Sequence, residues 1–114
     1  MMTHPQRGEI WLGDFDPTRG REQAGKRPAL VVSVNEFNAG GADLVVVLPI
    51  TSKFKGIPWH VEVAASEGGL KTRSFIKCED VRSIAKDRLT KRWGRVSPAT
   101  LDAVEARLRI LLEL

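Results

Sequence analysis

Two short, almost purely apolar runs constrain the fold of this chain more than any other feature. Residues 29–34 and 44–50 consist mainly of valine and leucine. Each run has the length of a strand and is shorter than a typical helix, so we expect both to form buried strands. The segment 35–41 between them closes with Gly40-Gly41 and predicts a turn or a single helical turn.

Further strand-like runs fill the first three quarters of the sequence, and turn residues bound them. Residues 9–15 are rich in strand-forming types and stop at Asp16-Pro17, while residues 59–64 alternate between polar and apolar side chains. A polar loop with glycines is expected at 18–27. The other short strands are expected at 73–78, 80–84 and 94–96.

The end of the chain changes to a helical period. Ser97 can cap a helix, and Pro98 suits its first turn. Apolar residues then follow on one helical face: Leu101, Val104, Leu108 and Leu111. The pattern predicts a mostly β (α+β) fold, a small barrel of antiparallel strands with a C-terminal α-helix. At 114 residues we expect a single domain, 1–114.

The composition of the chain indicates which kind of binding partner and which cellular compartment to expect. The net charge of +4 favours an anionic partner such as nucleic acid, but it equally fits an ordinary basic protein. The single cysteine, Cys78, excludes an internal disulfide and suits a reducing compartment. The N-terminal stretch lacks a signal-like apolar segment, and the run 44–50 is far too short to span a membrane. We therefore expect a soluble, cytoplasmic protein.

Common catalytic signatures are mostly absent from the sequence. A Ser-His-Asp arrangement stays open, although none of the serines has the sequence context of a nucleophile elbow. The sequence has no phosphate-binding loop of the GxxxxGK type. His4, His60 and Cys78 are too few to build a convincing zinc site. We expect no metal and no cofactor.

The loop 18–27 concentrates positive charge between two expected strands. Arginine presents a planar fork that matches phosphate oxygens, so such a loop suits an RNA backbone. A solvated hairpin loop is the alternative, because most charged loops are of that kind. The cationic residues are Arg19, Arg21, Lys26 and Arg27, and Gly25 permits close backbone approach.

Arg27 and Thr51 stand at the ends of the two buried strands. Arg27-Pro28 leads into the run 29–34, and Thr51 follows the run 44–50. Transition-state stabilisation needs rigidly placed groups, which strand ends provide. Both side chains could point into one cleft, although Thr51 also fits an ordinary strand-ending threonine.

Several segments resemble one protein family, in the same order along nearly the whole chain. The most specific is RGEIWLGDFDPTRGREQAGKRPALVVS, at residues 7–33. The later ones are LVVVLPITS, PWHVEV, GGL, and KCEDVRSI followed by RL. Together they resemble the MazF/PemK-like toxins of bacterial type II toxin–antitoxin systems.

This resemblance implies a fold, an activity and two partners. The fold would be an SH3-like barrel of the CcdB/MazF type, assembled as a homodimer. The activity would be metal-independent, sequence-selective cleavage of single-stranded RNA, in which the 2′-OH attacks the adjacent phosphate. The products would carry a 2′,3′-cyclic phosphate and a 5′-OH, and translation and growth would stop. A cognate antitoxin, acidic and with a flexible tail, would block the basic cleft.

The resemblance also assigns catalytic residues. Arg27 would stabilise charge on the phosphorane, and Thr51 would hydrogen-bond the phosphate or orient the 2′-OH. Glu22 would orient Arg27 or act as base, or would form only a surface ion pair. The acid and the base are the least determined roles, because a guanidinium gives up its proton with difficulty.

A wider set of residues is expected to bind RNA. Trp59 can stack on unpaired bases. Trp93 could do the same but is not included among these residues, and Ser74 equally fits a plain strand serine. The set consists of Arg19, Arg21, Gln23, Gly25, Lys26, Ser52, Lys53, Trp59 and Ser74.

Two other classes of function compete with this interpretation. A toxin resembling CcdB would poison DNA gyrase without cutting RNA, through residues near the C-terminal end of its helix. Here that helix ends in Leu-Leu-Glu-Leu, which suits packing. The third possibility is a nucleic-acid-binding module without activity, against which Arg27 and Thr51 argue weakly.

Overall fold

The computed structural model describes residues 4–15 and 25–114, and strands make up most of its regular elements. The two helices are α1 (Asn35–Asn38) and α2 (Pro98–Leu112), and the 3₁₀ turns are η1 (Glu67–Gly69) and η2 (Lys86–Arg88). The strands are β1 (Glu9–Asp14), β2 (Lys26–Val31), β3 (Leu44–Thr51), β4 (His60–Val63), β5 (Ser74–Lys77), β6 (Arg82–Ala85) and β7 (Leu89–Arg95). The predicted mostly β domain with a C-terminal helix is confirmed.

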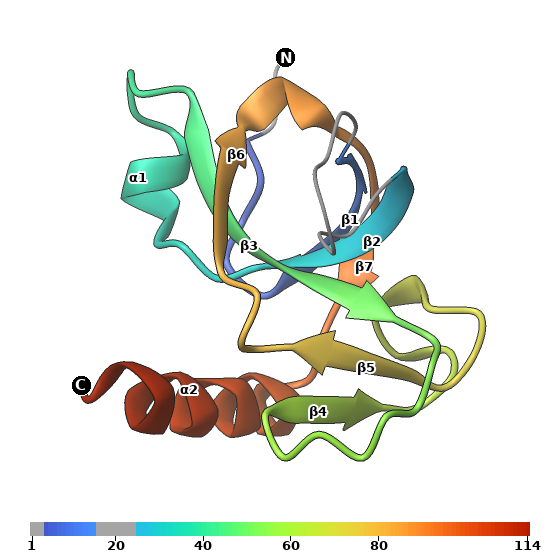
Figure 1. Ribbon diagram of the computed structural model, residues 1–114. Helices are drawn as coiled ribbons and strands as arrows, with labels where there is room; N and C mark the ends of the chain where they lie inside the picture. The colour runs from blue at the N-terminus through green and yellow to red at the C-terminus, as the bar shows by residue number, and fades with distance from the viewer. Residues whose placement is uncertain (1–3, 16–24) are drawn as a thin grey trace.

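The strands form one antiparallel sheet that bends strongly on itself (Figure 1). Their order is β4-β5-β3-β2-β1-β7, and β6 pairs with the first half of β3. Within the described part of the chain this path ends at β4 and β7 without a pairing that closes it. The word barrel therefore describes the sheet only loosely.

Strand β3 has two different partners along one of its edges. The first half of the strand, residues 44–47, pairs with β6, and its last two residues, Ile50 and Thr51, pair with β5. Strand β2 lies along the opposite edge. A proline in a strand pattern usually indicates a strand end, but Pro49 lies inside β3 and is fully buried. Proline cannot donate to a strand ladder, and Pro49 sits at the change of partner, where that defect costs least.

Two strands are longer than predicted. β2 begins at Lys26, so Lys26 and Arg27 belong to a strand rather than to the preceding loop. β7 begins at Leu89, five residues before the predicted start at Gly94. Both additions consist largely of exposed polar residues, which carry little apolar pattern. They form strands because β1 pairs with both of them.

The helix α2 packs against β4 and lies beside it in Figure 1. The Ser97 side chain caps it by accepting a hydrogen bond from the Thr100 N–H at 3.2 Å, and Pro98 occupies its first turn. Val104 is fully buried, and Leu101 and Leu108 pack on the same core. Three of the four residues predicted for the apolar face are thus confirmed as packed on the core, and Leu111 is not among them. Leu112 and Leu114 at the apolar end are exposed, so the expectation that this end serves packing within the chain is wrong. No helix among the described residues has the length and apolar character needed to cross a membrane.

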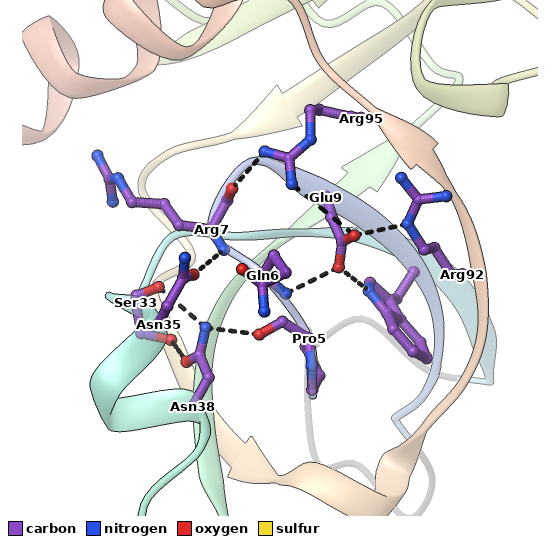
Figure 2. Close-up of polar contacts among 10 residues, drawn as sticks. Pro5, Gln6, Arg7, Glu9, Ser33, Asn35, Asn38, Arg92 and Arg95 are labelled. Atoms are coloured by element: carbon purple, nitrogen blue, oxygen red, sulfur yellow. Dashed lines mark hydrogen bonds and ion pairs between the residues drawn. The ribbon is translucent and has the colours of Figure 1, made fainter. Parts of the chain in front are cut away.

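A buried carboxylate, Glu9, ties the start of the chain to β1 and β7 (Figure 2). Its Oε1 accepts hydrogen bonds from the Gln6 backbone N–H at 2.7 Å and from the Trp11 indole at 3.0 Å. Its Oε2 accepts one from Arg92 at 2.6 Å and lies 3.9 Å from the Arg95 guanidinium. Burial alone would raise the pKa of Glu9, but these hydrogen bonds outweigh it and lower the pKa overall.

Candidate active site

The register between β2 and β3 determines where the two predicted catalytic residues lie. Ala29 is opposite Pro49, and Leu30 is opposite Leu48. The same register, continued toward the start of β2, brings Arg27 opposite Thr51. Side chains directly opposite one another in an antiparallel pair point to the same face. Residues that are distant in the sequence are therefore presented together.

Arg27 and Thr51 line one cleft of about 150 Å³ at this end of the sheet. Two residues of the predicted RNA-binding set, Ser52 and Ser74, line it as well. The other walls come from β2, β3, the loop after η1, and β7. They are formed by Pro28, Ile50, Leu70, Lys71, Thr72 and Trp93.

A glycine brings the loop after η1 against β7. Gly69 has a φ of +82°, and a Cβ there would lie 2.4 Å from the backbone oxygen of Trp93. Only glycine adopts this conformation readily and also permits such a close approach. The contact places Lys71 and Thr72 on the same cleft as Trp93.

Hydroxyl groups in the cleft are oriented by local hydrogen bonds. The Thr51 Oγ1 accepts from the backbone N–H of Lys53 at 3.2 Å. A hydroxyl has one donor and two acceptor lone pairs, so this bond orients Thr51 without using its donor. The Ser74 hydroxyl is buried and donates to the Thr72 carbonyl at 2.9 Å.

The charge of the cleft lining is positive. Arg27 and Lys71 are the cationic members among the described residues that line it, and none of those described residues is acidic. Cationic and hydroxyl groups attract a phosphate and are poor ligands for a metal ion. Across residues 4–15 and 25–114, no group of three or more His, Cys, Asp or Glu side chains is placed to hold a metal.

This geometry coincides with a match to a known family. A sequence model of the PemK-like, MazF-like toxins of type II toxin–antitoxin systems matches residues 6–112. The chain belongs to this family. The toxin is 40% identical to the endoribonuclease MazF9 of Mycobacterium tuberculosis, over 96% of the toxin and 97% of that relative.

Solved structures agree with this assignment. A crystal structure of MazF from Deinococcus radiodurans is 30% identical and superposes with a TM-score of 0.87, over 99% of the toxin and 100% of that chain. An endoribonuclease from a mycobacterial species, solved with its cognate antitoxin, is 26% identical with a TM-score of 0.79, over 99% and 97%. These matches do not favour the gyrase-poison alternative.

Other predicted site residues of the toxin lie outside the cleft lining or outside the described residues. Trp59 is half-buried in the turn before β4, and Lys53 contributes its backbone N–H to Thr51. Gly25 accepts a hydrogen bond from the Phe15 N–H at 3.0 Å, and Lys26 lies opposite Asp14. The residues outside the described ranges are Arg19, Arg21, Glu22 and Gln23.

Lys71 and Thr72 are lining residues that sequence reasoning missed. The segment GGL before them, at residues 68–70, served only as part of the family resemblance. A turn that needs glycine for close packing is the signal that could have located them. Trp93 was considered for base stacking but was left out of the set in favour of Trp59, which the structure does not bring to the cleft.

Proposed function

We propose that this toxin is an endoribonuclease that cuts single-stranded RNA at selected sequences without a metal. The observation that carries the proposal is the β2–β3 register, which presents Arg27 and Thr51 on one face of one cleft. The positive, hydroxyl-bearing lining supports a phosphate substrate, and the related MazF9 is named an endoribonuclease.

The proposed reaction is an intramolecular transesterification. The ribose 2′-oxygen attacks the adjacent phosphorus, and the bond from phosphorus to the 5′-oxygen breaks. The 2′-OH loses its proton and the leaving 5′-oxygen gains one, so the products are a 2′,3′-cyclic phosphate and a 5′-OH. Negative charge accumulates on the phosphorane oxygens between these steps.

The side chains then have distinct proposed roles. Arg27 neutralises the developing charge, and Thr51 hydrogen-bonds the phosphate or orients the 2′-OH. Glu22, which lies outside the described residues, orients Arg27 or accepts the proton. Ser52, Lys53 and Lys26 contact the RNA on either side of the reacting phosphate.

The proposal includes a setting for the enzyme. The toxin acts as a cytoplasmic homodimer and stops growth by cutting RNA. A cognate antitoxin with an acidic, flexible segment covers the positive cleft and blocks it. The mycobacterial relative was solved in complex with its cognate antitoxin, which supports an antitoxin as partner.

Cleavage of a long single-stranded RNA in EDTA tests the function. We expect discrete cuts with cyclic phosphate ends, and about a 10²–10³-fold slower rate for Arg27→Ala. Thr51→Ala is expected to be slower as well, because it removes the hydroxyl from the cleft. Arg109→Ala, which changes an exposed arginine on α2, is the matched control and should cut normally.

Two results contradict the proposal. One is the absence of cutting by the unchanged protein on RNAs of varied sequence in EDTA. The other is a folded Arg27→Ala protein that cuts as fast as the unchanged one.

A further inference from the structure

The face that presents Arg27 and Thr51 continues across two more strands. Phe75 on β5 lies opposite Thr51, and Glu62 on β4 lies opposite Phe75. Since opposite residues share a face, one row of side chains runs from β2 to β4. The surface beyond the catalytic cleft is thus part of the same face.

An exposed aromatic ring stands over this extension. Phe54 follows Thr51 by three residues, so their Cα atoms are at most about 11 Å apart, and Phe54 is 68% exposed. Its ring meets Phe75 edge to face, with centroids 5.6 Å apart and an interplanar angle of 60°. Phe75 is buried beneath it. The packing holds the Phe54 ring in place while much of it faces solvent.

A guanidinium completes the arrangement. The Arg73 Cζ lies 5.8 Å from the Phe54 ring centroid and 5.1 Å from that of Phe75. Glu62 holds Arg73 through two hydrogen bonds, Nε to Oε2 at 2.6 Å and Nη2 to Oε1 at 3.0 Å. A bidentate pair fixes the plane of a guanidinium. The hydrogen bonds from Arg73 also lower the pKa of Glu62, which keeps the pair ionised.

A second cleft, of about 260 Å³, opens beside these groups. Phe54, Phe75 and Glu62 line it, together with Ile57, His60 and Arg107. Thr51, Ser52 and Ser74 line the first cleft, and Phe54 and Phe75, which come soon after them in the chain, line the second. The two clefts are therefore neighbours.

An aromatic ring and a fixed guanidinium are the two groups on which an unpaired nucleobase stacks. We propose that Phe54 and Arg73 form a base-stacking subsite for a nucleotide next to the scissile phosphate. This subsite rests on the proposed endoribonuclease function and adds a determinant of where the RNA is held. It is built from this chain's own Phe54, Arg73 and Phe75, none of which is required for the catalytic step.

A fluorescent RNA tests the subsite separately from cleavage. Once the unchanged protein has been used to map a cut site, that sequence is made as a short RNA with a 2′-deoxy sugar at the cut. The missing 2′-OH prevents cleavage. 2-Aminopurine, whose fluorescence falls when it stacks, is placed at each neighbouring position in turn.

We expect protein binding to quench 2-aminopurine at one of these positions. Phe54→Ala should remove the quenching and weaken binding about 5-fold to 150-fold. Phe54→Trp should retain both, and Arg73→Ala should reduce both. Phe37→Ala removes another exposed phenylalanine, on α1, and should change neither.

The outcomes separate this subsite from the catalytic proposal. Arg27→Ala should lose cleavage of the all-ribose RNA while the quenching persists. Quenching and affinity that are unchanged in Phe54→Ala would overturn the subsite and leave the endoribonuclease proposal intact. Weaker binding of Phe54→Ala with full quenching at saturation would assign Phe54 a structural role and also overturn the subsite. Failure of the unchanged protein to cut any RNA would overturn both proposals.

Discussion

Positively charged side chains serve two regions of this toxin in different ways. Around Glu9, Arg92 and Arg95 approach a buried carboxylate that the protein itself supplies (Figure 2). Around the candidate cleft, Arg27 and Lys71 lie among hydroxyl-bearing and apolar side chains in the part of the lining that the structure describes. In the first region a buried carboxylate of the chain meets the cations, whereas the described lining of the second combines cations with hydroxyl groups.

This contrast shows that the residue type alone does not identify a functional arginine in the sequence. An arginine alone does not mark a site, because β7 carries arginines that hold the fold together. The surroundings distinguish the roles: a buried carboxylate makes the arginine a structural contact, and a cleft of hydroxyls and cations is the setting in which we propose a phosphate contact. We therefore expect mutations around Glu9 to lower stability and mutations in the cleft to lower the cleavage rate.

The largest expected effect on stability is that of Glu9→Ala. It removes the acceptor of the Gln6 and Trp11 donors and the partner of Arg92. Buried donors without an acceptor are costly, so we expect the free energy of unfolding to fall by about 3 kcal/mol. Urea denaturation followed by circular dichroism measures this change.

Glu62→Ala is the matched control for that experiment. Glu62 also pairs with an arginine, Arg73, but both side chains are more than half exposed. Surface ion pairs contribute little to stability, so its effect should be clearly smaller. Equal losses for Glu9→Ala and Glu62→Ala would break the distinction between the two regions.

The helix, the apolar strands and the short α1 could be predicted from the sequence because their signals are local. Ser97-Pro98 and the spacing of Leu101, Val104 and Leu108 suffice for α2. The extents of β2 and β7 were not predictable in this way. Their exposed polar residues become strand only through pairing with β1, which is a long-range contact.

For the candidate site, too, some features could be predicted from the sequence and others depend on long-range contacts. Arg27 and Thr51 were identified by resemblance, and their juxtaposition depends on the β2–β3 register, which a single sequence does not determine. Lys71 and Thr72 reach the cleft because Gly69 packs against Trp93. Of the two tryptophans considered for base stacking, Trp93 lines the cleft and Trp59 does not, and a role of either in RNA binding stays a prediction. Which face and which edge a side chain reaches is a property of the folded sheet.

Acid should lower the free energy of unfolding through three hydrogen-bonded carboxylates, none of which is among the described residues that line the cleft. Burial raises the pKa values of Glu9, Glu67 and Asp80, but hydrogen bonds to each carboxylate outweigh it, so all three are lowered overall. The unfolded chain thus binds more protons between its own pKa values and those of the folded state. The contribution to stability is complete above the ordinary pKa values of 4.5 for Glu and 3.8 for Asp, and is lost as the pH falls below them and through the lowered pKa values of the folded state.

Urea denaturation at a series of pH values below neutrality measures this loss. The free energy of unfolding should decline most steeply below the ordinary carboxyl range. In Glu9→Gln the decline should be shallower, because one of the three carboxylates no longer takes up a proton. A slope unchanged by Glu9→Gln would show that Glu9 does not contribute to the acid sensitivity.

The smallest expected effect, Arg92→Ala, gives the sharpest comparison with Arg27→Ala. The Arg92 side chain is about half exposed, and Glu9 keeps its bonds from Gln6 and Trp11 without it. We expect a loss of about 1 kcal/mol in unfolding free energy and an unchanged cleavage rate. Arg27→Ala should do the reverse, with stability within about 0.5 kcal/mol of the unchanged protein and cleavage largely lost. Measuring both properties on both variants gives a double dissociation, and an Arg92→Ala protein that is stable but fails to cut would place Arg92 on the RNA path instead.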